Sequence, residues 1–242
     1  MILAVIPYTG SEKLVQMTAR CIESLLPTIE EADVDVKVVA VANKPDRLLT
    51  PEELQGAEQM SIPSNVGFGP AVNKTLEYYE FFGNITDALV LNNDLVFEQK
   101  DWLLKLLAEK NKCSLYKERY VFAPMTDVTA TQEAVSPRAI DEPAIRLPEI
   151  SAYCWLVPFS FCQSVEVRFG FRLFNPLFPN YGSDDCTASI LRKVYGRTPF
   201  KLVRRSWVKH LKAQTANELG VKAGTKELLS QLRSWKSKNK CP

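Results

Sequence analysis

The sequence predicts an α/β protein in which a mostly parallel, Rossmann-like sheet is flanked by helices. Short apolar or β-branched segments alternate with longer segments of helical periodicity, which is the pattern of repeated β-α-β units. The chain has 242 residues and 46% hydrophobic content, enough to bury the core of one large domain. It contains no internal repeat and no clear linker, so we expect a single domain over residues 1–242.

The first half of the chain supplies most of this alternation. The expected strands are short and mostly apolar or β-branched, with 57–62 the weaker signal, and the expected helices carry apolar residues at helical spacing. We expect strands at 2–7, 34–41, 57–62, 87–91 and 120–123, and helices at 12–26, 68–82 and 101–110.

The pattern changes after residue 125. Residues 126–149 contain three prolines and no helical period, which predicts a long surface excursion of the kind that often covers a binding pocket. The aromatic segment 150–161 predicts a strand, whose rings either belong to the core or stack on a ligand. The remaining expected elements are a helix at 184–195, a short strand at 200–203, a segment at 207–210 and a final helix at 225–235.

Cysteine usage and hydropathy exclude several classes of protein. The six cysteines show neither paired spacing nor a zinc-like alternation with histidine, which favours reduced, mostly buried thiols. No apolar stretch approaches the ~20 residues needed to cross a bilayer, and no basic leader precedes the apolar residues 2–6. We therefore expect a cytoplasmic protein.

Charge is unevenly distributed along the chain. From Arg192 onward there are 14 Lys and Arg against two acids, which leaves 30 − 14 = 16 basic and 28 − 2 = 26 acidic groups in residues 1–191. The final part is therefore strongly basic. Such asymmetry indicates a polyanionic partner, either nucleic acid or an anionic membrane surface. The alternative is a basic tail that is simply solvated.

Polar side chains follow the expected strand at 87–91. Asn92, Asn93 and Asp94 come directly after this buried strand, and ligand sites in open α/β sheets lie at the carboxyl ends of strands. Mg²⁺ and Mn²⁺ prefer carboxylate, carbonyl and water ligands, so Asp94 is a candidate metal ligand. An Asx turn followed by a loop-capping aspartate is the alternative.

A glycine-containing segment precedes the expected helix at 68–82. Gly67 and Gly69 would let the backbone approach a ligand closely, and a helix that begins near Pro70 would aim free N–H groups at that ligand. A simple turn before a helix explains the same glycines equally well.

An acidic pair and the only histidine complete the candidate site. Asp184 and Asp185 begin an expected helix, where the helix dipole also favours carboxylates without any catalytic role. His210 could complete a metal site, and its imidazole suits Mn²⁺ better than Mg²⁺. Together these features predict a metal-assisted transfer from a nucleotide donor.

The order of these motifs resembles the family-two glycosyltransferases of the GT-A fold, in particular their rhamnosyltransferase-like branch. The resemblance covers residues 1–212. It is strongest in residues 65–73, which look like the family's Asn-x-Gly-Phe-x-x-Ala-x-Asn stretch, and in residues 91–94 followed by 101–103, which look like its strand-end motif.

This resemblance implies an inverting glycosyltransferase with a Mn²⁺ or Mg²⁺ cofactor and a nucleotide-sugar donor such as a UDP-sugar. Asp94 and His210 would bind the metal, and Asp185, with Asp184 as its neighbour, would be the general base toward the acceptor hydroxyl. The implied donor-binding residues are Pro7, Tyr8, Thr9, Asn43, Asn65, Gly67, Asn73, Asn92 and Asn93.

The chain departs from the family pattern at three places. Asn92 stands where the family usually has an aspartate, Ala42 stands where it often has an acidic residue, and Thr187 stands where a second acid is expected. These departures leave open a non-catalytic module that binds a nucleotide sugar or nucleic acid. A nucleotidyltransferase is a further alternative, but residues 8–11 supply no basic glycine-rich loop.

The resemblance also divides the chain by function. Residues 1–125 would bind the nucleotide sugar, residues 126–212 would bind the acceptor, and residues 213–242 would form a basic helical extension. The acceptor is expected to be a saccharide or a hydroxylated nucleic-acid base. A DNA acceptor would make binding fall steeply with salt.

Overall fold

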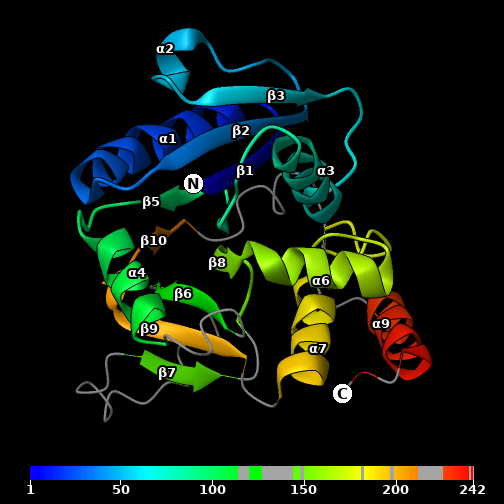
Figure 1. Ribbon diagram of the computed structural model, residues 1–242. Helices are drawn as coiled ribbons and strands as arrows, with labels where there is room; N and C mark the ends of the chain where they lie inside the picture. Colours follow the sequence, from blue (N-terminus) through cyan, green and yellow to red (C-terminus); the bar gives the residue numbers. More distant parts are fainter. Residues whose placement is uncertain are drawn as a thin grey trace.

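The computed structural model describes residues 1–113, 120–126, 144–147, 150–180, 183–196, 199–211, 226–239 and 241. Within these residues the chain forms an eight-stranded sheet of order β3-β2-β1-β4-β8-β6-β9-β7, with helices packed on both of its faces (Figure 1). The expected α/β class is confirmed.

The first four strands of the sheet are parallel and lie close to where the sequence predicts them. Because these strands are parallel, their carboxyl ends lie together at one end of the sheet, and each is followed there by a helix or a loop. These strands are β1 (Ile2–Gly10), β2 (Val36–Pro45), β3 (Glu58–Ile62) and β4 (Asp87–Leu91).

The second half of the sheet is mixed. Strand β8 (Cys154–Pro158) runs antiparallel between β4 and β6 (Val121–Met125), and β9 (Phe200–Trp207) runs parallel to β6. Cys154 pairs with Leu91, so β8 begins where β4 ends. An edge strand that the sequence did not predict, β7 (Ala144–Leu147), pairs antiparallel with β9 inside the expected excursion, most of which lies outside the described residues.

The helices form two groups, one on each side of the sheet (Figure 1). Trp102 Nε1 donates to Thr28 Oγ1 within the first group, and Gln163 Nε2 donates to Glu80 Oε1 within the second. The first group is α1 (Glu12–Ala32) and α4 (Trp102–Lys112), next to the short α2 (Pro51–Leu54). The second is α3 (Phe68–Glu80), α6 (Phe159–Phe169), α7 (Ser183–Tyr195) and the basic α9 (Lys226–Lys238).

Two helices differ from the sequence prediction. Helix α1 continues past Pro27 to Ala32 because Pro27 lies on the solvent side, where water can hydrate the carbonyl that proline leaves without a helical partner. Helix α6 begins at Phe159, inside the segment predicted as a strand. Phe159, Phe161 and Val165 face the core, whereas Val167 is exposed, so packing of one helix face overrides the strand propensity of these residues.

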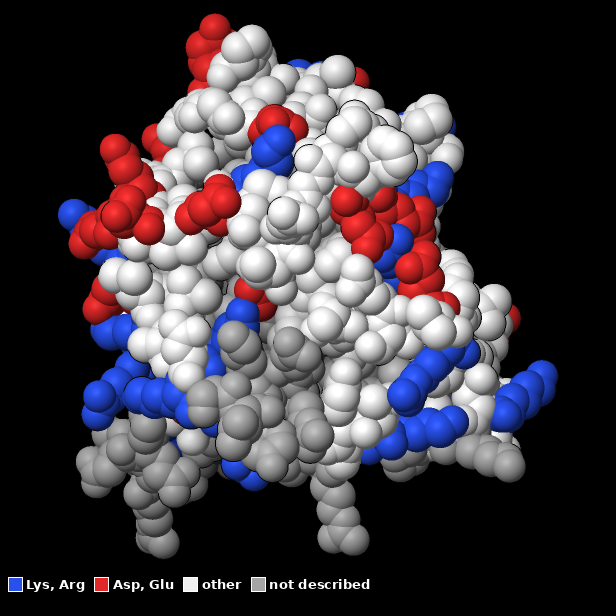
Figure 2. All heavy atoms as spheres, in the orientation of Figure 1, with Lys and Arg blue, Asp and Glu red and all other residues white. Residues whose placement is uncertain are grey.

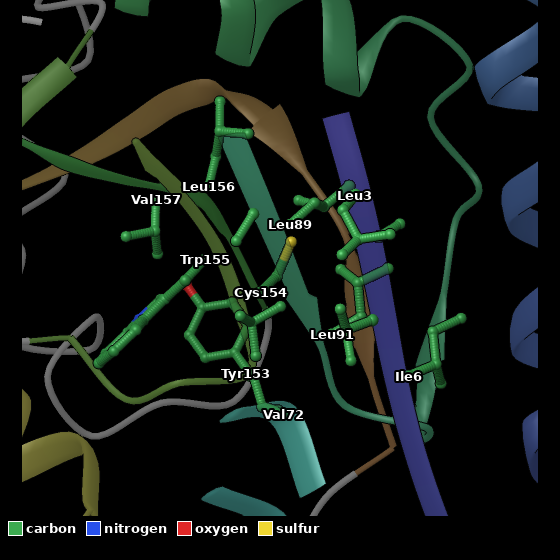
Figure 3. Close-up of a cluster of buried hydrophobic side chains, with 14 of the residues drawn as sticks. Leu3, Ile6, Val72, Leu89, Leu91, Tyr153, Cys154, Trp155, Leu156 and Val157 are labelled. Atoms are coloured by element: carbon green, nitrogen blue, oxygen red, sulfur yellow. The ribbon is translucent and has the colours of Figure 1, made fainter. Parts of the chain in front are cut away.

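The core lies between β1, β4 and β8 and the helices that cover them (Figure 3). The aromatic residues of the predicted strand, which could have been core or a ligand-stacking surface, are buried core residues. They are Tyr153, Trp155, Phe159 and Phe161.

The charge asymmetry of the sequence is visible on the surface. In Figure 2, acidic side chains gather mainly over the upper half and basic side chains over the lower half, including the region of α9. Residues 213–225 of the expected extension lie outside the described residues. Among the residues that the structure describes, no helix has both the length and the apolar character that spanning a bilayer requires.

Candidate active site

A two-stranded sheet brings Asp94 and His210 together at the carboxyl end of β4. Strand β5 (Leu95–Val96) follows Asp94 directly and pairs antiparallel with β10 (Lys209–His210), with His210 opposite Leu95. The Leu211 amide donates to the Asp94 carbonyl at 2.9 Å. As a result, His210 Nε2 lies 3.0 Å from Asp94 Oδ1. The two residues predicted as metal ligands, distant in sequence, are therefore neighbours.

The spacing of this pair fits a divalent cation. Two adjacent ligands of an octahedral ion at about 2.1 Å lie about 3.0 Å from each other, the separation seen here, which is also that of a direct hydrogen bond between the two side chains. Asp94 is 3% exposed, and a buried carboxylate is costly without a cationic or hydrogen-bonding partner. The described residues contain no group of three or more His, Cys, Asp or Glu side chains suited to a metal. Waters and the phosphates of a ligand would complete the coordination, as is usual for Mg²⁺.

Helix α1 holds the loop that carries Asp94. Thr18, Cys21 and Ser24 follow each other at intervals of three and share one face of the helix. Asn93 Nδ2 donates to Thr18 Oγ1 at 3.1 Å, the Cys21 thiol donates to the Asn92 carbonyl at 3.7 Å, and the Phe97 amide donates to Ser24 Oγ at 3.2 Å. The structure thus turns the side chain of Asn93, predicted to bind the donor, back toward α1.

Tyr153 packs against His210 of the Asp94–His210 pair, a role that sequence reasoning missed. Its ring stacks on the His210 imidazole at 5.8 Å between centroids, with 26° between the planes. Its hydroxyl donates to the Pro124 carbonyl at 2.6 Å, and its carbonyl accepts the Asn92 amide at 2.8 Å. Asn92 Nδ2 lies 3.5 Å from His210 Nε2, so Asn92 stays in the candidate site. An aromatic residue just before a strand was the available signal.

The asparagines predicted to bind the donor form a network beside β2. Asn43 Nδ2 donates to Asn65 Oδ1 at 3.0 Å and to the Gly67 carbonyl at 3.3 Å. Asn43 Oδ1 accepts the Val66 amide at 2.9 Å, and Asn65 Oδ1 accepts the Gly67 amide at 3.0 Å. The structure therefore brings Asn43, Asn65 and Gly67 together, in contacts that shape the turn before α3.

The glycines pack against the chain itself. A Cβ on Gly67 would lie 2.5 Å from the Pro179 Cβ, and one on Gly69 would lie 2.7 Å from the Phe174 Cβ. The Gly69 amide donates to the Pro179 carbonyl at 3.0 Å. The Phe68 amide donates to an Asn180 side chain at 3.4 Å. The expectation of free N–H groups at the start of α3 is therefore wrong for these two amides, because the segment before α7 accepts both.

Asn73 is buried, and its side chain binds the backbone of residues 173 and 174 in the segment before α7. Its Oδ1 accepts the amides of Leu173 and Phe174 at 3.0 Å each, and its Nδ2 donates to the Phe174 carbonyl at 2.7 Å. The polar atoms of Asn73, predicted to bind the donor, are thus engaged by the backbone. The contacts of α3 fix the path of the chain toward α7 and its acidic pair.

The residues at the end of β1 also make internal contacts. Tyr8 is 1% exposed, and its hydroxyl donates to Gln59 Oε1 at 2.6 Å while accepting the Leu49 amide at 3.2 Å. Burial raises the pKa of Tyr8. Thr9 Oγ1 donates to the Lys44 carbonyl at 3.4 Å, and Pro7 pairs with Val41 in the sheet. The buried Tyr8 ring belongs to the core.

The acidic pair occupies the first turn of α7, as the sequence predicts. Asp184 Oδ2 accepts the Ala152 amide at 3.4 Å, and its Oδ1 accepts the Asp185 amide at 3.1 Å. Burial, reinforced by the negative charge of Asp185, raises the pKa of Asp184 to about 6. Ala152 precedes Tyr153, so one short segment contacts both Asp184 and His210.

Comparison with known proteins identifies the fold. No protein-family model and no curated protein matches the sequence. Glucosyl-3-phosphoglycerate synthase from Mycobacterium tuberculosis, solved with Mg²⁺ and UDP, is 16% identical over 91% of this chain and 74% of its own, with a TM-score of 0.57. The mannosyltransferase PcManGT from Pyrobaculum calidifontis, solved with GDP-Man and Mn²⁺, is 14% identical over 88% of this chain and 57% of its own, with a TM-score of 0.57.

A third similar structure is S. aureus TarS 1-349, which is 11% identical over 96% of this chain and 64% of its own, with a TM-score of 0.57. At these identities the similarity establishes the fold. The chain therefore has the GT-A fold of nucleotide-sugar glycosyltransferases, as the sequence predicts.

Proposed function

We propose that the protein is an inverting glycosyltransferase that moves a sugar from a nucleoside-diphosphate donor to an acceptor hydroxyl. The observation that carries this proposal is the Asp94–His210 pair, with a 3.0 Å separation that suits two ligands of one cation. The pair lies at the carboxyl end of β4, in a fold whose similar structures hold Mg²⁺ or Mn²⁺ with UDP or GDP-Man.

Each group of residues in the candidate site has its own role in the proposed transfer. Asp94 and His210 would hold Mn²⁺ or Mg²⁺, which when bound offsets the charge of a departing diphosphate. Asp185 takes the proton from the acceptor hydroxyl as that oxygen attacks the sugar. Asp184 holds the start of α7 against Ala152 through its hydrogen bond. Asn43, Asn65 and Asn92 lie at or near the ends of β2, β3 and β4, where a nucleotide would bind.

Metal binding tests the central observation directly. We expect Asp94→Asn and His210→Ala each to weaken Mn²⁺ affinity at least tenfold, measured by electron paramagnetic resonance with and without UDP. Glu77→Gln, which removes an exposed carboxylate of α3, should leave the affinity unchanged. Unchanged Mn²⁺ affinity in both site variants would remove the metal pair from the proposal.

Transfer chemistry is tested by assaying a panel of nucleotide sugars with Mn²⁺ for release of nucleoside diphosphate. Asp185→Asn should retain donor binding and lose transfer, because it removes the base without touching the metal pair. A protein that binds the donor but releases no diphosphate from any sugar would be the non-catalytic module, an alternative favoured by Asn92 in place of a second aspartate.

The acceptor is proposed to be a saccharide or a hydroxylated nucleic-acid base. The basic α9 and the basic last turn of α7 support a polyanionic acceptor, since both lie on the side of the molecule where Lys and Arg gather (Figure 2). Binding of a nucleic-acid acceptor should weaken steeply between 50 and 200 mM salt. Binding that is flat over that range would favour the saccharide.

The reduced state of the cysteines supports a cytoplasmic location for this activity. All six cysteines are free thiols, four of them buried. Disulfides are rare in the reducing cytoplasm, so this arrangement fits that compartment.

A further inference from the structure

A cysteine and a lysine meet where the end of α4 packs on β9, away from the candidate active site. Lys201 Nζ lies 2.9 Å from Cys113 Sγ. This separation is shorter than an ordinary van der Waals contact between nitrogen and sulfur. Cys113 follows α4 directly, and Lys201 is the second residue of β9, so the contact joins two elements far apart in sequence.

The surrounding groups hold the amine against the sulfur. Glu109 Oε1 lies 3.4 Å from Lys201 Nζ, and the Tyr120 ring centroid lies 5.2 Å from the same nitrogen. The Cys113 thiol donates to the Glu109 carbonyl at 3.3 Å. The side chain of Lys201 is 12% exposed and Glu109 is 7% exposed, so the ammonium has little freedom to leave its place beside the sulfur of the half-buried Cys113.

We propose that Cys113 and Lys201 form a reversible covalent bridge through a single oxygen atom, Sγ–O–Nζ, when the protein is exposed to dioxygen. The thiol and the ammonium react with one dioxygen to give the bridge, one water and one proton. The O–O, S–H and N–H bonds break, and one S–O and one N–O bond form. Sulfur and nitrogen each lose two electrons, and dioxygen accepts all four.

The other cysteines lack this arrangement. Four are buried. The second half-buried cysteine, Cys241, donates to the Asn239 carbonyl at 3.6 Å. The ammonium of the nearby Lys193 donates a hydrogen bond to that same carbonyl and not to the sulfur, so Cys241 provides a matched control. Its partial exposure resembles that of Cys113, but no contact between its sulfur and an amine comparable to the 2.9 Å pair is seen among the described residues.

Mass spectrometry of the full-length protein tests the bridge. After exposure to air, the intact mass should rise by about 14 Da, for one oxygen gained and two hydrogens lost, and return to its starting value in dithiothreitol. Digestion should yield one cross-linked pair of peptides containing Cys113 and Lys201. Both variants Cys113→Ser and Lys201→Met should lose the shift, and Cys241→Ser should keep it.

Other products would overturn the proposal. A rise of about 16 Da indicates sulfenic acid at Cys113 without any bond to nitrogen, and a rise of about 32 Da indicates sulfinic acid. A shift of about 14 Da that survives in Lys201→Met places the modification elsewhere, and no shift at all rules the bridge out. Mapping the peptides of the unsubstituted protein distinguishes these products even where a variant folds poorly.

Discussion

Replacing Asp184 with asparagine should stabilise the protein at neutral pH. The pKa of this carboxyl rises from an ordinary value of 3.8 to about 6, chiefly through burial and secondarily through the charge of Asp185. The folded state therefore binds this proton more tightly than the unfolded state, and ionising Asp184 destabilises the fold. The penalty is absent well below pH 3.8, grows as the pH rises toward 6, and is complete above it.

The size of the effect follows from the same two values. The difference between 3.8 and about 6 corresponds to about 3 kcal/mol of unfolding free energy above pH 7, and to about half of that at pH 5. Asparagine is neutral at every pH, but it keeps only one oxygen, so it can accept either the Ala152 amide or the Asp185 amide and not both. The lost hydrogen bond costs about 1 kcal/mol, so Asp184→Asn should gain about 2 kcal/mol at pH 8.

Urea unfolding at pH 5 and pH 8 measures this gain. Glu23→Gln, at an exposed position of α1, serves as the control and should change stability little at either pH. A gain of equal size at both pH values would show that the effect is not the cost of ionisation. No gain at pH 8 would show that the carboxylate is better solvated than its surroundings indicate.

Three further outcomes are expected. Gly69→Ala should destabilise the fold by about 1–3 kcal/mol in urea unfolding, since its Cβ would meet Phe174 at 2.7 Å, whereas Gly83→Ala should be nearly neutral because its nearest neighbour is a flexible side-chain end at 3.3 Å. Lys110→Met should cost about 3–5 kcal/mol in the same assay, because it removes the ammonium that lies 2.5 Å from the buried carboxylate of Asp87. Thermal shift assays should show stabilisation by UDP or GDP that increases with Mn²⁺, and ligand-independent melting would contradict donor binding.

Most of the first half of the fold was predictable because β1 and β4 are buried on both faces and read as continuous apolar segments, whereas the edge strand β3 is mainly polar and partly exposed. Residues 87–91 are such a segment, and β4 has these bounds. The second half was harder because propensity and packing disagree there. Residues 159–169 contain three phenylalanines and two valines, and they form a helix because one face packs on the core.

The candidate site was predictable as a set of residues and not as an arrangement. Asp94 and His210 carry recognisable chemistry, but their contact depends on pairing between β5 and β10, two strands of two residues each that no periodicity reveals. Asn73 was harder still. A motif can mark a residue as important without distinguishing a ligand contact from a backbone clamp, and here the side chain holds residues 173 and 174.

Residues on the two sides of the proposed division at residue 125 contact each other. Asp94 belongs to the expected donor half and His210 to the expected acceptor half, yet they touch. The segment at 173–180 is likewise tied to α3 across that division. The two halves are therefore joined at the site itself.

The loop after β4, which carries Asp94, is held in place by polar side chains of α1. Its conformation therefore depends on the packing of α1 on the core. Zinc fingers behave differently, since their ligands acquire order when the metal arrives and a chelator denatures them. Here the scaffold comes first, because Thr18 and Ser24 already hold the loop on a helix whose apolar residues are buried. Removing a bound cation with a chelator should therefore abolish the proposed transfer activity without unfolding the protein.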